Sequence, residues 1–128
     1  MKIVIIEDEP DTAEMYAEMM RISGYEVVKF FGGISAVDHL AEQEPDAVVL
    51  DLMMPDLSGM EVLNYIREEP SLSELPVIIV SAKTLPEDVE KGLGAGAAAY
   101  LTKPVSFYDM KLAIDEALSK SSKTRGAN

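Results

Sequence analysis

The sequence of 128 residues contains no cysteine. This absence excludes disulfide bonds, thiolate metal ligands and thiol nucleophiles, and it agrees with a reducing compartment. Basic residues are also few, because 11 Lys and Arg stand against 23 Asp and Glu and give a formal net charge of -12. That charge disfavours contact with nucleic-acid phosphates or anionic lipid. We therefore expect proteins or cations as partners, with no direct nucleic-acid binding and no membrane contact.

Long apolar runs are absent as well. The first run, in "MKIVII", is too short for a secretion signal and acidic residues follow it at once, so we expect a cytoplasmic protein. A length of 128 residues with 48% hydrophobic and 27% charged residues is typical of one globular domain. We place this domain at residues 1–120 and expect the polar segment 121–128 to be a disordered tail or linker.

Apolar runs of strand length do occur, at residues 2–6, 25–30, 46–50, 76–82 and 98–102. Helical segments are predicted between and after them, at residues 10–23, 34–44, 58–69, from Pro86 onward, and 106–120. In the first helix, Met15, Met19 and Ile22 are predicted to share the apolar face. The fourth is expected to be short and mobile because it contains three glycines. Strict alternation with short connections predicts an α/β fold, in which helices cover both faces of a parallel sheet.

Polar residues that could carry chemistry follow four of the predicted strands. Ligands of such open sheets bind beyond the carboxyl ends of the strands. The residues at those ends are Glu7, Asp8 and Glu9 after the first strand, Asp51 after the third, Ser81 after the fourth and Lys103 after the fifth. Singly, each has an ordinary interpretation, as a complement to a helix dipole, a turn residue, a loop hydroxyl or a solvated charge. Their common placement favours a shared site.

Charge crowding indicates what this site would bind. Several carboxylates in one pocket raise one another's pKa, and a hard divalent cation such as Mg²⁺ resolves the conflict. Lys103 would add a second positive charge and Ser81 a hydroxyl donor, as phosphoryl transfer requires. Asp51 is then the predicted nucleophile, which would form an acyl phosphate.

The motifs "IIEDEP", "VVLDLMMPDLSGMEVL", "VIIVSAK" and "GAGAAAYLTKP", in this order, resemble the receiver domain of bacterial response regulators over about residues 2–120. The resemblance implies a flavodoxin-like, doubly wound parallel sheet of five strands in the order 2-1-3-4-5, with five helices. It also implies that a sensor histidine kinase or phosphotransfer protein passes a phosphoryl group from its phosphohistidine to Asp51. Such a domain is a signalling switch that catalyses only its own phosphorylation and dephosphorylation.

The resemblance assigns further roles to single residues. Mg²⁺ would bind Asp8, Asp51 and the backbone carbonyl of Met53, with Glu7 acting through water. Lys103 would pair with the phosphoryl group, its bond to Pro104 would be cis, and Ser81 would move to bond the phosphoryl group. Glu7 and Ser81 stand where Asp and Thr are frequent, and both keep the chemical group.

Tyr100 matches the family's switch aromatic, which turns inward and changes a face that controls an output protein or a fused output domain. In related transcription-factor receivers this face dimerises through complementary charges, including an acid just before the aromatic and an arginine in the last helix. Here Ala98 and Ala99 precede Tyr100, and residues 106–120 contain no arginine. We therefore expect the isolated domain to be a monomer.

Two alternatives remain open at this stage. An aspartyl-phosphate phosphohydrolase also uses a strand-end aspartate, magnesium and lysine, but it usually has a second aspartate two residues later, where this chain has Met53. A scaffold of the same fold that is not phosphorylated would be expected to lack Asp8, Asp51 or Lys103, and all three are present.

Overall fold

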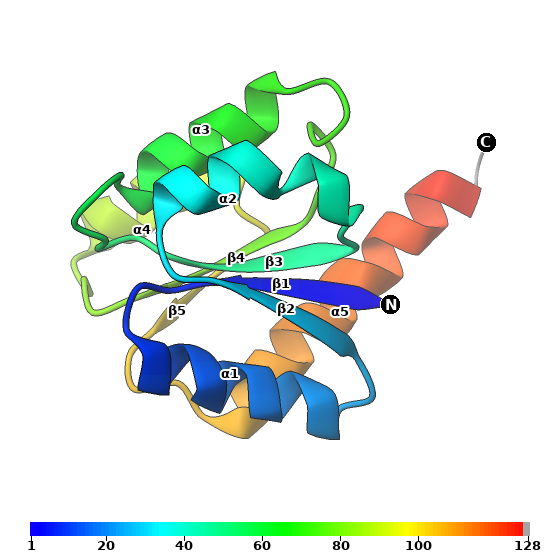
Figure 1. Ribbon diagram of the computed structural model, residues 1–128, viewed down its shortest axis with the longest axis horizontal. Coiled ribbons are helices and arrows are strands. Elements are labelled where there is room, and N and C mark those ends of the chain that lie inside the picture. Colours follow the sequence, from blue (N-terminus) through cyan, green and yellow to red (C-terminus); the bar gives the residue numbers. More distant parts are fainter. Residues whose placement is uncertain (127–128) are drawn as a thin grey trace.

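A computed structural model describes residues 1–126 as five strands and five α-helices (Figure 1). The strands are β1 Lys2–Ile6, β2 Glu26–Phe30, β3 Ala47–Asp51, β4 Val77–Ser81 and β5 Ala99–Thr102. The helices are α1 Pro10–Ile22, α2 Gly33–His39, α3 Gly59–Glu68, α4 Pro86–Gly94 and α5 Phe107–Gly126, and a 3-10 turn, η1, spans Ala41–Gln43. All pairings are parallel and the strand order is β2-β1-β3-β4-β5. The predicted fold class and strand order are confirmed.

Two apolar layers sandwich the sheet, with α1 and α5 on one face and α2, α3 and α4 on the other (Figure 1). Every residue of β3 and β4 is buried, because helices cover these strands on both sides. Alternate side chains go to opposite layers, so Val49 packs with the α1 and α5 cluster and Val48 with the α2 and α3 cluster. The two strands thus form a rigid base for whatever follows their last residues.

The buried face of α1 differs in part from the prediction, because only Met19 of the three predicted residues packs against the core, as a partly buried residue. Met15 and Ile22 are 47% and 72% exposed. The face that meets the sheet consists of Ala13, Tyr16, Ala17 and Met20. This set has the same helical spacing as the predicted one, and its two alanines let the helix approach the sheet closely, so side-chain size decided the face rather than hydrophobicity alone.

Two predicted helix ends are also wrong. The second helix ends at His39, and the 3-10 turn after it ends at Gln43, followed by Glu44 in the left-handed region at φ 49. Pro45 comes next and cannot continue a helix. At the other terminus, α5 continues to Gly126, past the predicted end at Lys120. The expectation of a tail or linker over 121–128 stays a prediction. No proline or glycine lies between Phe107 and Gly126, so no residue of this segment breaks the helix. Residues 127 and 128 lie outside the described residues. Among the helices within residues 1–126, none has both the length and the apolar character needed to cross a membrane.

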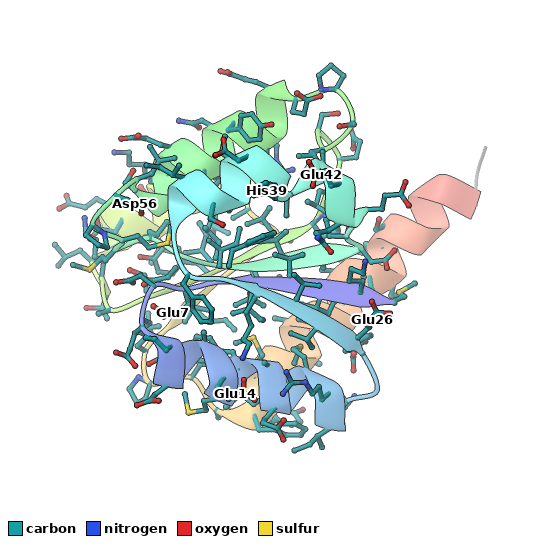
Figure 2. The ribbon with its side chains drawn as sticks, viewed as in Figure 1. Glu7, Glu14, Glu26, His39, Glu42 and Asp56 are labelled. Atoms are coloured by element: carbon teal, nitrogen blue, oxygen red, sulfur yellow. The ribbon has the colours of Figure 1, made fainter. Side chains whose placement is uncertain are left out.

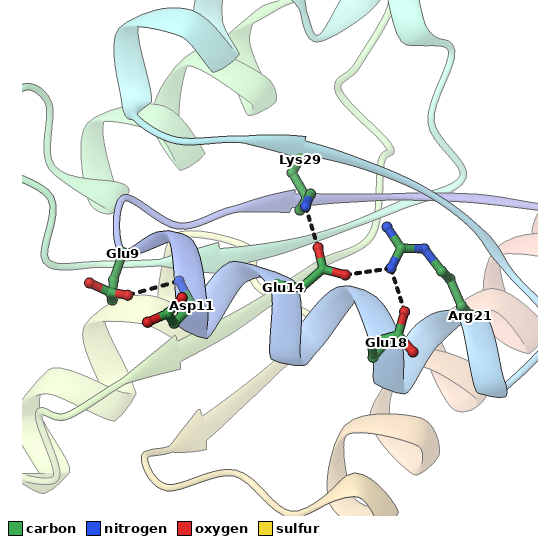
Figure 3. A network of polar contacts seen from close by, with 6 residues as sticks. All are labelled: Glu9, Asp11, Glu14, Glu18, Arg21 and Lys29. Atoms are coloured by element: carbon green, nitrogen blue, oxygen red, sulfur yellow. Dashed lines mark hydrogen bonds and ion pairs between the residues drawn. The ribbon is translucent and has the colours of Figure 1, made fainter.

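Ion pairs on the surface join α1 to β2 (Figure 3). Glu14 accepts hydrogen bonds from Lys29 of β2 and from Arg21, whose Nη1 lies 2.7 Å away, and Arg21 also contacts Glu18 at 2.6 Å. These side chains are between 27% and 58% exposed. Exposed pairs of this kind each add little to stability.

Unlike these exposed ion pairs, one half-buried arginine bonds backbone carbonyls. Arg67, near the end of α3, donates from Nη1 to the carbonyls of Ser73 (3.2 Å) and Leu75 (2.7 Å), and from Nη2 to the carbonyl of Gly96 (2.7 Å). A Cβ at Gly96 would lie 2.7 Å from Arg67 Nε, and the φ of Gly96 is +105, so this position needs glycine twice over. One guanidinium therefore fastens the loops before β4 and β5 to α3.

Arg67→Lys should destabilise the fold by about 1 to 3 kcal/mol, because an ammonium group cannot reproduce the planar fork that reaches three carbonyls. Arg21→Lys is the matched control and should change stability by less than about 0.5 kcal/mol, since its partners are exposed carboxylates. Urea unfolding of both variants measures the difference. Equal losses would contradict the role given to Arg67.

Candidate functional site

Three carboxylates lie together where β1 and β3 end. These strands are neighbours, with Ile6 paired to Leu50, so the residues that complete them meet at one edge of the sheet. Glu7, Asp8 and Asp51 each offer an oxygen within 4.8 Å of the other two. Glu7 and Asp51 are only 2% and 4% exposed. Three acids at this separation, two of them buried, repel one another strongly unless cations or protons intervene.

Lys103 reaches this cluster from the edge of the sheet. It follows β5, and its N–H donates to the Ser81 carbonyl at 2.9 Å, which extends the pairing with β4. Its Nζ donates to Glu7 Oε1 at 2.9 Å and lies 3.6 Å from Asp51 Oδ2. Burial lowers the pKa of Lys103, but the hydrogen bond to Glu7 and the charges of Asp51 and Glu7 outweigh it and raise the pKa overall. The ammonium group is therefore charged at neutral pH. The bond from Lys103 to Pro104 is cis, as expected.

The three acids that follow β1 have separate surroundings. Glu7 accepts from Lys103 through Oε1 and from the Glu9 N–H through Oε2 at 3.2 Å, so both of its oxygens are engaged. Glu9 lies outside the cluster as the N-cap of α1, where it accepts from the Asp11 N–H at 2.8 Å (Figure 3). Figure 2 shows Glu7 just before α1, at the edge of the sheet where β1 ends.

Asp8 is a member of the cluster whose ionisation is disfavoured. Its pKa is raised, first by burial and then by a hydrogen bond with Glu7 and by the charge of Glu7. Its own backbone bond and the charge of Lys103 act in the other direction without cancelling these effects. Burial and the neighbouring Glu7 thus make ionisation of Asp8 less favourable than in water, although Lys103 acts against them.

Asp51 and Ser81 occupy equivalent positions at the ends of β3 and β4. Asp51 Oδ1 accepts from the Met53 N–H at 3.2 Å, and the Met53 side chain is 55% exposed. Ser81 is fully buried, and its Oγ accepts from the Lys83 N–H at 3.1 Å. The hydroxyl therefore already holds the loop that leads from β4 to α4.

Tyr100 of β5 holds the same loop from the other side. Its hydroxyl donates to the Lys83 carbonyl at 2.8 Å. Its ring lies against α4 at Gly92, where a Cβ would be 3.0 Å from Tyr100 Cδ2 and 2.8 Å from Ile79 Cδ1. Gly92 therefore makes room for the aromatic ring, although by propensity it only weakens the helix.

One neighbour of the cluster, Tyr16, lies on a helix, so the positions at strand ends did not predict it. Tyr16 of α1 is 2% exposed, and burial raises the pKa of its phenol. The charge of Lys103 lowers this pKa and the charges of Glu7 and Asp51 raise it, which places Tyr16 within electrostatic range of the cluster. Its helical spacing with Ala13 and Met20 identifies it only as a core residue.

The donors present fit a hard divalent cation. Carboxylate and carbonyl oxygens are the ligands that Mg²⁺ prefers, and neither thiolate nor imidazole is part of the cluster. Asp8 and Asp51 would hold the ion directly, and its charge would favour ionisation of Asp8, whose pKa is raised by burial and by Glu7.

Comparison with known proteins identifies relatives of the chain. Residues 3–115 match the family model described as "Response regulator receiver domain". The "Probable transcriptional regulatory protein TcrX" of Mycobacterium tuberculosis is 38% identical over 122 residues, which cover 95% of this chain and 51% of that protein. The chain thus spans about half the length of this relative.

Two further matches cover most of the partner's length. The "Polar-differentiation response regulator DivK" of Brucella ovis is 32% identical over 104 residues, which cover 81% of this chain and 85% of that protein. The crystal structure of a response regulator receiver domain protein from Clostridium thermocellum has a TM-score of 0.89 and 28% identity, covering 96% of this chain and 98% of that one.

Asp8→Asn should stabilise the metal-free protein. Because the pKa of Asp8 is raised above its ordinary value of 3.8, ionising it costs stability as the pH rises, and at neutral pH the full repulsion is present. In EDTA at pH 7 we expect the melting temperature to rise by roughly 2 to 5 °C, the effect of about 1 kcal/mol in a domain of this size. Millimolar Mg²⁺ should raise the melting temperature of the unaltered protein by mass action and should not raise that of the variant.

Asp11→Asn is the matched control, because it removes one exposed charge from the first turn of α1 and leaves the cluster intact. It should keep the response to Mg²⁺. An Asp8→Asn protein that is less stable in EDTA, or that still responds fully to Mg²⁺, would contradict this account of the cluster.

Proposed function

The chain belongs to the family of response regulator receiver domains, and on this premise we propose that it is a switch controlled by phosphorylation of Asp51. The donor would be the phosphohistidine of a sensor histidine kinase or phosphotransfer protein. The observation that carries the proposal is the position of Asp51, a buried carboxylate 3.6 Å from a lysine and beside two further acids. Packing of the apolar core does not explain a carboxylate at this position. Burying a carboxylate costs free energy unless a charged partner offsets it.

The transfer would use the geometry of Asp51 and Lys103. A carboxylate oxygen of Asp51 attacks phosphorus, a P–O bond forms, the P–N bond to the donor imidazole breaks, and the imidazole leaves with the electron pair and takes up a proton. Lys103 would stay protonated, and its Nζ, which lies 3.6 Å from Asp51 Oδ2, would contact a phosphoryl oxygen.

Mg²⁺ would be held by Asp8, Asp51 and the backbone carbonyl of Met53, and when bound it would neutralise charge on the phosphoryl oxygens. Glu7 would act through water, because both of its oxygens already accept hydrogen bonds.

The switch would run from Ser81 to α4. Ser81 Oγ would leave the Lys83 N–H and bond a phosphoryl oxygen, which alters the loop that the Tyr100 hydroxyl holds at the Lys83 carbonyl. Tyr100 would then report phosphorylation to the face formed by α4, β5 and α5. The ring leaves no room for a side chain at Gly92, where a Cβ would lie 3.0 Å from Tyr100 Cδ2, and this close packing of ring and helix supports the coupling.

This face would control an output protein or a fused output domain, and the domain would catalyse only its own phosphorylation and dephosphorylation. One relative is named a transcriptional regulatory protein and is about twice as long, which is compatible with a fused output domain, and another is named a response regulator and is of similar length. We propose that the isolated domain is a monomer, because the net charge of -12 opposes self-association. The cytoplasmic location stays a prediction.

Asp51→Asn should abolish phosphoryl incorporation, because an amide oxygen is a poor nucleophile. With radiolabelled acetyl phosphate, the unaltered protein should take up label only when Mg²⁺ is present, and the variant should show none above background. Asp38→Asn, an exposed substitution on α2, should leave labelling within about twofold. Label on the Asp51→Asn protein at the unaltered level would remove the central assignment.

Tyr100→Phe should separate the chemistry from its output. The ring that packs on Gly92 remains, and the hydrogen bond to Lys83 is lost. We expect labelling within about threefold of the unaltered rate, whereas the NMR shift changes that beryllofluoride induces in α4 should be strongly reduced. Tyr108→Phe, which alters a tyrosine that is 69% exposed, should keep those changes. Full α4 changes in Tyr100→Phe would show that the hydroxyl has no part in the switch.

A further inference from the structure

The segment that follows Asp51 has no regular structure, yet it is held tightly. Residues 52–58, the acceptor loop, connect β3 to α3. Its ends are joined, because the Gly59 N–H donates to the Leu52 carbonyl at 2.9 Å. A Cβ at Gly59 would lie 2.3 Å from the Asp51 carbonyl oxygen, so only glycine allows this closure. Leu52 and Met54 are buried, and Met53 between them is exposed.

Asp56 anchors the exposed side of this loop to a different element. Its Oδ1 accepts from the Gly33 N–H at 3.1 Å and the Leu57 N–H at 2.8 Å, and its Oδ2 accepts from the Ile34 N–H at 3.0 Å. Figure 2 shows Asp56 beside the start of α2. These bonds to Ile34, Gly33 and Leu57 lower the pKa of Asp56, so the carboxylate is ionised at neutral pH.

The start of α2 is shaped to receive this carboxylate. The N-cap residue of α2, Gly32, has no side chain with which to cap the helix, so the first N–H groups need an acceptor from elsewhere. A Cβ at Gly32 would lie 2.8 Å from Asp56 Oδ2, and one at Gly33 would lie 2.7 Å from the Leu57 Cβ. The two glycines therefore leave the space in which the acceptor loop approaches the helix.

We propose that Asp56 is a positioning residue for the metal site: by tying the acceptor loop to α2, it holds Met53 at a fixed place relative to Asp51. The proposal rests on the proposed function. The Met53 N–H donates to Asp51 Oδ1 at 3.2 Å, so a shift of the loop would change this bond and the place of the Met53 carbonyl relative to the Asp51 carboxylate. Mg²⁺ demands near-ideal octahedral geometry, so its affinity is sensitive to such a shift.

A simpler role would be capping alone, in which Asp56 stabilises α2 and the loop would keep its position without it. The two roles differ in what happens to the folded protein. Capping alone predicts lower stability with an unchanged Mg²⁺ affinity, whereas positioning predicts a weaker affinity even under conditions in which the protein is fully folded.

The test is a Mg²⁺ titration followed by amide NMR and calorimetry, on Asp56→Ala and Asp56→Asn at a temperature where both are folded. Asp56→Ala should weaken Mg²⁺ binding by about tenfold or more, the range found for residues that orient metal ligands. Asp56→Asn keeps one acceptor oxygen and should fall between the alanine variant and the unaltered protein. The Gly33 and Ile34 amides should exchange faster with solvent in Asp56→Ala.

Asp38→Asn is the control, because it also removes one negative charge but lies on α2 and not in the acceptor loop. This variant should bind Mg²⁺ like the unaltered protein. Unchanged Mg²⁺ affinity in both Asp56 variants, with faster amide exchange, would overturn the positioning role and leave the proposed function intact. Failure of the unaltered protein to bind Mg²⁺ would instead overturn the proposed function. If the alanine variant does not fold, the asparagine variant decides the question.

Discussion

Electrostatic repulsion among the carboxylates of Glu7, Asp8 and Asp51 is the constraint on which the site depends. The acids cannot separate, because β1 and β3 are paired neighbours buried between two helical layers. Within the described residues, the positive charge that contacts two of them, Lys103, comes from the far side of β4 and bonds the acid at the end of β1. The electrostatic balance at the centre of the sheet therefore depends on the position of its edge strand. Any charge that enters the cluster is also felt at β5.

Much of the fold could be predicted from the sequence, because apolar runs and their spacing specify strands and helices directly. The strand order came from the resemblance to receiver domains, since no periodicity encodes which strands are neighbours. The errors have physical causes. In α1, the buried face contains two alanines, whose small side chains give a weaker hydrophobic signal than Met15 and Ile22. At the C-terminus, the polar composition of residues 121–126 concealed a segment with no helix breaker before its end.

The candidate site was predicted where a residue follows a strand, as with Asp51, Ser81 and Lys103. Residues that act through loops were missed. Arg67 and Asp56 bond backbone groups far away in the sequence, and the partners of such bonds carry no side-chain signal. Gly92 was interpreted through helix propensity, although the structure shows that the constraint comes from Tyr100. Such contacts depend on how close two segments approach, which a single sequence does not state.

The Arg67 fork has a mechanical consequence for α4. Just beyond its C-terminus, α4 is fastened through Gly96 to a guanidinium that also holds two other carbonyls. Before its N-terminus, the loop is held at Lys83 by hydrogen bonds with the hydroxyls of Tyr100 and Ser81. If the bonds to Lys83 break while those of Arg67 remain, α4 can rotate about its Gly96 end. Nine helical residues span about 13 Å, so a rotation of only 10° about the Arg67 end would move the other end by roughly 2 Å. The fold thus allows α4 to tilt about its Gly96 end, with the largest displacement at its Pro86 end, to which the loop after Ser81 leads.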